Sequence, residues 1–82
     1  MKQFKGVQGT WWKYRDIIDA DDGNSIARVQ GCYSQEIEDA NAKLIAAAPE
    51  LLKALELIMS NSTDHAIIRI ASKAINKALN ND

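Results

Sequence analysis

Cys32 and His65 are the only cysteine and the only histidine in the chain. A catalytic pair of this kind needs hydrogen-bond contact between the two side chains and a third group that orients the base. The two residues lie in opposite halves of the chain, and no pattern brings them together. A zinc site needs about four ligands, which one cysteine and one histidine do not supply. We therefore expect no enzyme, no metal and no cofactor.

Four aspartates form an acidic cluster: Asp16, Asp19, Asp21 and Asp22. Calcium loops place aspartates at positions 1, 3 and 5 and glycine at position 6. With Asp19 and Asp21 at positions 1 and 3, Gly23 and Asn24 follow in the wrong order. A solvated hairpin tip explains the cluster better. The same four residues are a candidate acidic surface for a basic partner.

The clearest charge pattern is a basic stripe formed by Arg69, Lys73 and Lys77. No acidic residue occurs between His65 and Asn81, and none occurs before Asp16. If the two basic segments adjoin, they form a face that could bind nucleic-acid phosphates. The structural alternative is an ordinary solvated helix face, with cations near the helix C-terminus.

Trp11 and Trp12 are adjacent, so on a strand their side chains point to opposite faces. We predict that Trp12 lies inside the protein, with Tyr14 beside it. Trp11, Lys13 and Arg15 then form an exposed patch for a partner, because tryptophan is enriched at interface hot spots. The alternative is that Trp11 packs under the last helix.

The composition limits the class of protein. The chain has 82 residues, of which 46% are hydrophobic and 26% charged, and its net charge is −1. This length suits one domain over residues 1–82. No apolar run approaches the roughly 20 residues of a membrane helix, and one cysteine cannot form an internal disulfide. We expect a cytoplasmic protein with no membrane partner.

The β part is expected in residues 1–33, which contain all four glycines and all five aromatic residues. An antiparallel pair is predicted, roughly 11–19 with 25–31. Asp21-Asp22-Gly23-Asn24 supplies the turn between them, because Gly and Asn tolerate a positive φ. Ile17-Ile18 continues the first strand or follows a bend, and residues near 4–8 are a candidate third strand at the edge.

Three helices are expected at about 35–48, 49–60 and 64–80. Ser34 is a plausible N-cap of the first, and proline suits the first turn of a new helix, so Pro49 marks the boundary between the first two. The fold class is therefore α+β: an N-terminal antiparallel β-hairpin or three-stranded meander packed on three C-terminal helices. The apolar face expected on the first helix comprises Ile37, Ala40, Asn41, Leu44 and Ala48.

Helix 49–60 is apolar over more than half of its circumference. A helix of this kind lies at the centre of a core or in a subunit interface. We therefore expect a homodimer through helix 49–60.

Residues 39–55 resemble a segment, ANAxLIAAAPELLxAL, of small proteins from tailed bacteriophages and prophages. Those proteins often carry an upstream strand with a tryptophan, followed by an IA-x-V pattern. In this chain Trp11/Trp12 occupy the place of the tryptophan, and residues 26–29 have the IA-x-V pattern. The resemblance covers roughly residues 10–58. A Gly-Pro usually precedes the tryptophan, whereas this chain has Gly9-Thr10.

The resemblance implies a phage accessory protein that acts in the cytoplasm of the bacterial host. Small non-enzymatic phage proteins commonly occlude a host machine, and anti-CRISPR proteins are one such class. The leading hypothesis is a protein that binds and inhibits a host protein complex in an anti-defence role. The alternatives are a nucleic-acid or nucleotide-binding module that uses the basic helix face, and a self-assembling phage structural protein.

Overall fold

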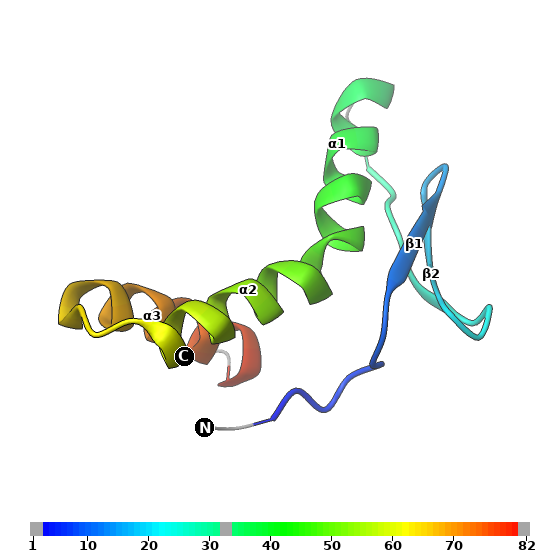
Figure 1. Cartoon of the computed structure of the whole chain (residues 1–82). Helices are drawn as coiled ribbons and strands as arrows, with labels where there is room; N and C mark the ends of the chain where they lie inside the picture. Colours follow the sequence, from blue (N-terminus) through cyan, green and yellow to red (C-terminus); the bar gives the residue numbers. More distant parts are fainter. Residues whose placement is uncertain (1–2, 32–33, 81–82) are drawn as a thin grey trace. The chain divides into compact units, whose positions relative to one another are not determined.

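The structure is a computed structural model that describes residues 3–31 and 34–80, with the side chain of residue 80 left aside. It has an α+β fold, as predicted: a three-stranded sheet followed by three helices. Figure 1 shows β1 and β2 beside α1, with α2 and α3 following along the chain. The elements are β1 (Trp11–Tyr14), β2 (Ile17–Ala20), β3 (Ser25–Arg28), α1 (Gln35–Ala46), α2 (Ala48–Asn61) and α3 (His65–Asn80). The three helices begin and end within two residues of the expected ranges.

The chain divides into two compact units. One comprises Gly6–Pro49 and contains the sheet and α1. The other comprises Glu50–Asp82, with α3 and nearly all of α2, together with the N-terminal segment through Lys5. The expectation of a single domain over residues 1–82 stays a prediction.

The sheet is an antiparallel meander in the order β1-β2-β3. Tyr14 pairs with Ile17, so Arg15 and Asp16 form a two-residue loop between β1 and β2. The long strand expected over residues 11–19 is therefore two strands, and the bend expected before Ile17 is the alternative that forms. The third strand arises from this break, because residues 4–8, all of them described, form no strand.

Arg15 makes this break possible, because it is the one non-glycine residue in the described part of the chain with a positive φ, of 56°. A positive φ at only the first loop position is the pattern of a type II′ turn, where glycine is preferred. The second hairpin turns at Gly23, where φ is +87°. Asp22 supports that turn by accepting hydrogen bonds from the backbone N–H and side-chain amide of Asn24, at 3.0 and 3.1 Å.

The prediction for the two tryptophans is wrong. Trp12 and Tyr14 are 60% and 65% exposed, whereas Trp11 is half-buried. The reason lies in β2, where Ile18 and Ala20 are the buried residues. Trp11 pairs with Ala20, and paired residues on neighbouring strands share a face of the sheet. Burying the apolar side of β2 therefore turns Trp11 inward and Trp12 outward.

Helix α1 begins at the predicted N-cap, since the Ser34 hydroxyl accepts a hydrogen bond from the Ile37 backbone N–H at 3.3 Å. It contacts β1 and β2, and its one buried residue is Ala42. The expected apolar face of this helix is wrong in orientation, because Ile37 and Leu44 are exposed. The side of α1 that carries Ala42 faces the sheet instead. The small side chain of alanine allows the helix to lie close to the strands.

Pro49, the last residue of the unit that contains the sheet, lies in the first turn of α2, as expected for a residue that lacks a backbone N–H. Helix α3 begins after Asp64, whose carboxylate accepts hydrogen bonds from the Ala66 and Ile67 backbone N–H groups at 2.8 and 3.4 Å. Ala71 and Ile75 are the buried residues of α3.

The two positive-φ turns predict opposite effects of substitution. Gly23→Ala places a methyl group in open space, so its cost is backbone strain alone, about 1 kcal/mol. Arg15→Gly relieves the same kind of strain and raises stability by up to about 1 kcal/mol. Urea unfolding followed by circular dichroism checks both variants. A loss of stability on Arg15→Gly would show that the turn tolerates arginine without strain.

Candidate functional site

The outer face of the sheet presents three neighbouring residues, Trp12, Tyr14 and Arg15, which we call the aromatic face. The Trp12 indole N–H donates a hydrogen bond to Asp21 Oδ1 at 2.6 Å. The Arg15 guanidinium carbon lies 5.7 Å from the centre of the Tyr14 ring, which is the distance of a cation–π contact. The exposed side chains of this face are therefore held in place by their neighbours.

Gly9 positions the carboxylate that holds Trp12. Asp21 Oδ2 accepts a hydrogen bond from the Thr10 backbone N–H at 3.4 Å. A Cβ atom on Gly9 would lie 2.9 Å from the same oxygen, and the φ of Gly9 is +91°. Only glycine meets both conditions without strain. Gly9, Asp21 and Trp12 thus act as one linked set.

Each aspartate of the predicted acidic surface has a partner within the two hairpins. Asp16 accepts from the Arg28 Nε–H at 3.1 Å and Asp19 from the Ser25 hydroxyl at 3.0 Å. The hydrogen bond from Arg28 is the main cause that holds the pKa of Asp16 below its usual value. Asp21 binds Trp12, and Asp22 binds Asn24. The four aspartates therefore stabilise the two hairpins through hydrogen bonds, and they also make the surface of the sheet more negative.

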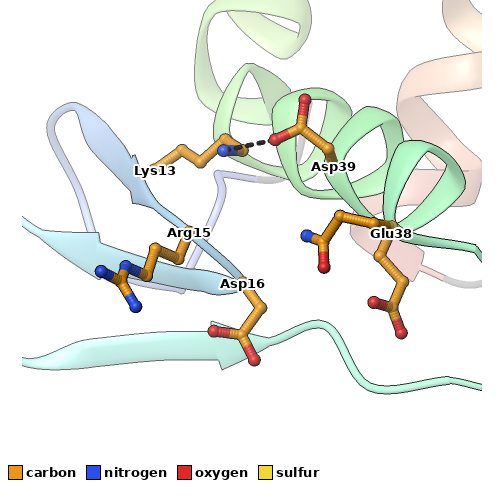
Figure 2. A pocket seen from close by; sticks show the side chains of 6 residues that line it. Lys13, Arg15, Asp16, Glu38 and Asp39 are labelled. Carbon is orange, nitrogen blue, oxygen red and sulfur yellow. Dashed lines mark ion pairs between the residues drawn. The ribbon is translucent and has the colours of Figure 1, made fainter.

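A cleft of 570 Å³ lies between the β1–β2 turn and α1 (Figure 2). Its lining residues are Lys13, Arg15, Asp16, Gln35, Glu38 and Asp39. Lys13 Nζ lies 2.7 Å from Asp39 Oδ1, and Lys43 Nζ lies 3.1 Å from Asp39 Oδ2. Hydrogen bonds from Lys13, and then Lys43, hold the pKa of Asp39 below its usual value. The cleft contains both signs of charge, and the Lys13–Asp39 pair joins the sheet to α1.

The structure keeps Lys13 and Arg15 of the predicted patch on one cleft, whose lining does not include Trp11. Trp11 and Lys13 lie on the inner side of the sheet, where the Trp11 indole N–H donates to the Val7 carbonyl at 3.1 Å. Arg15 is exposed in the turn, where it contacts Tyr14 and also lines the cleft with Lys13. Sequence reasoning missed Trp12 and Tyr14 as surface residues. The polar Asp19 between two apolar residues of β2 could have indicated which face is inward.

The three residues of the basic stripe, Arg69, Lys73 and Lys77, are exposed on α3. None of them forms an ion pair with another described residue. Their roles in binding, like those of Trp11, Lys13 and Arg15, stay predictions.

The remaining chemistry-bearing residues add no site to those above. His65 is exposed at the start of α3, and Cys32 lies outside the described residues. Within residues 3–31 and 34–80, no three His, Cys, Asp or Glu side chains are grouped to hold a metal ion. None of the described helices is long and apolar enough to cross a membrane.

These features define a small α+β protein with an exposed aromatic surface on its sheet. Residues 1–82 match the model of the family described as Salmonella phage P22 protein Y8K6, and the chain belongs to that family. It is therefore a phage protein, as the sequence resemblance implied. The resemblance of residues 39–55 to a particular phage segment stays a prediction. No curated protein and no solved structure matches the chain.

The Lys13–Asp39 pair predicts unequal effects of two lysine substitutions. Lys13 is 22% exposed and joins two elements, whereas Lys43 is 70% exposed and joins residues of one helix. Lys13→Ala therefore lowers the urea midpoint more than Lys43→Ala, because an exposed i,i+4 pair within one helix contributes little to stability. Equal midpoints for the two variants would show that the pair does not hold the sheet to α1.

The lowered pKa of Asp39 predicts how stability depends on pH. Its stabilising effect is complete at pH values above the usual carboxyl pKa of about 4, and it declines as pH falls through the lowered value. Asp39→Asn removes this decline, because the amide does not titrate. The decline is measured from the urea midpoints of the wild type and the variant between pH 6 and pH 2.5. Parallel curves for the wild type and the variant would contradict the assignment.

Proposed function

We propose that this phage protein binds and inhibits a host protein complex in the bacterial cytoplasm, without enzymatic activity of its own. The observation that carries the proposal is the aromatic face. Tryptophan, tyrosine and arginine are the residue types most enriched at binding hot spots, and here Trp12, Tyr14 and Arg15 lie together on an exposed face.

The aromatic face is also ordered before binding. Asp21 accepts a hydrogen bond from the indole of Trp12, and the guanidinium of Arg15 lies 5.7 Å from the centre of the Tyr14 ring. A partner therefore does not have to immobilise these side chains, which saves about 0.5–1.5 kcal/mol for each mobile side chain. Exposed aromatic rings that are held in this way are better suited to binding than to solvation.

The charges around the aromatic face favour a protein over a nucleic acid. Asp16, Asp19 and Asp21 lie in the same two hairpins, and their carboxylates repel phosphates. A protein surface with an apolar pocket and a basic rim complements both the rings and the aspartates. An anti-defence target, such as a CRISPR effector complex, is the finer form of the proposal, and it rests on the class of small phage inhibitors.

Nucleic acid remains the rival ligand because of the exposed basic stripe on α3. Binding through Arg69, Lys73 and Lys77 would weaken steeply with salt, with a slope of about −0.9 for each phosphate contacted on duplex DNA. Binding through the aromatic face would depend much less on salt.

The test begins with the tagged protein in nuclease-treated bacterial lysate at moderate salt. We expect one protein complex to be retained in near-stoichiometric amount, and its affinity is then measured with purified variants. Trp12→Ala should weaken binding about 30-fold, which is about 2 kcal/mol. Leu44→Ala is the matched control, because Leu44 is 63% exposed on α1, away from the outer face of the sheet.

Circular dichroism establishes that both variants remain folded. If Leu44→Ala weakens binding and Trp12→Ala does not, the aromatic face is not the binding surface. If the partner is recovered only without nuclease, and reversal of charge at Arg69, Lys73 and Lys77 abolishes binding, the ligand is a nucleic acid and the proposal fails.

A further inference from the structure

Helix α2 carries an apolar stripe that its own unit leaves exposed. Leu51, Ala54 and Ile58 are all exposed and follow the spacing i, i+3, i+7. This spacing places them in one line along the helix, as in helices that pack by inserting side chains between those of a neighbour. The inner side of α2 is marked instead by Leu52 and Met59, which are half-buried.

Helix α3 carries a second stripe with the same spacing. Ile67, Ile70, Ala74 and Ala78 are all exposed, and Ile70 is 70% exposed. The inner side of this helix is marked by Ala71 and Ile75. Two helices alone cannot bury apolar residues over so much of their circumference, so both stripes remain without cover within the unit.

The two stripes lie on one face of the helix pair. At about 100° per residue, the stripe of α2 is rotated by roughly 115° from the inner side of its helix, and the stripe of α3 by roughly 75° in the same sense. Helices α2 and α3 are joined by residues 62–64 and run antiparallel within their unit (Figure 1). In an antiparallel pair, rotations of the same sense point to the same face. The pair therefore presents a single apolar face.

We propose that a second copy of this chain covers that face, with α2 of each copy packed antiparallel on α3 of the other. The side chains fit in one register: Leu51 faces Ala74, Ala54 faces Ile70, and Ile58 faces Ile67. Two of the three layers thus place a large residue against a small one, which lets helices approach closely. A two-fold axis makes the same contact twice and closes a four-helix assembly.

Charge supports the same register. Glu50 borders the stripe of α2, while Lys73 and Lys77 border the stripe of α3. All three are exposed, and none forms an ion pair among the described residues. In the register above, Glu50 of one copy faces position 75 of the other, between the two lysines. An unrelated partner would have no reason to match both the apolar pattern and the charges.

Sedimentation equilibrium of the purified full chain tests the proposal. We expect a mass of twice 9.1 kDa for the wild type. Ile70→Glu should weaken the dimer at least 10-fold, because it places a carboxylate in the apolar stripe. Leu57→Glu is the matched control: Leu57 is 57% exposed on α2 but lies roughly 100° from the stripe, so the dimer should persist.

A charge exchange tests the register. Glu50→Lys alone and the double change Lys73→Glu with Lys77→Glu should each weaken the dimer, and the three changes together should restore it. A wild type that stays monomeric at high concentration would overturn the proposal. Equal loss from Ile70→Glu and Leu57→Glu, or no recovery in the triple variant, would also overturn it.

The dimer and the aromatic face are separable. Trp12→Ala should leave the mass unchanged, because Trp12 belongs to the other unit. A host protein that binds the wild type but not Ile70→Glu, with a monomeric wild type, would assign the apolar face to the host and not to a second copy.

Discussion

The burial of Ile18 under α1 orients the side chains of β1 and β2. Side chains alternate along a strand and paired residues share a face, so turning Ile18 inward also turns Lys13 and Ala20 inward. Trp12 and Tyr14 must then face outward. The exposed aromatic surface is thus a consequence of core packing, and the inward lysine receives its partner, Asp39, from the helix that covers Ile18.

The buried core is small in both units. The buried apolar residues of the described chain are Ile18, Ala20, Ala42, Ala71 and Ile75, and three of these are alanines. A chain of this length buries only about 60% of the surface exposed when it unfolds. Large apolar side chains on the helices remain exposed, which suits a protein whose final stability comes in part from contacts with other molecules.

The two units carry surfaces of different character. The sheet presents fixed aromatic rings among carboxylates that are already hydrogen-bonded within the hairpins. The helix pair presents aliphatic stripes bordered by a glutamate and by lysines. We propose the first surface for recognition of a partner, since its exposed rings have a hydrogen-bond or cation partner within the sheet. The second suits self-association, since its pattern is complementary to itself.

Local backbone chemistry allowed the sequence by itself to determine the elements. Ser34, Pro49 and Gly23 act within a few residues of their own position, so the helix ends and the second turn could be predicted. The sequence did not decide whether the first strand breaks at Arg15, because arginine is not a usual residue for a positive φ. The directions of Trp11 and Trp12, and the inner side of α1, were decided only by tertiary structure. A tryptophan on either side of β1 fits the period-2 pattern equally well, and only the pairing of that strand with Ile18 and Ala20 distinguishes the two sides.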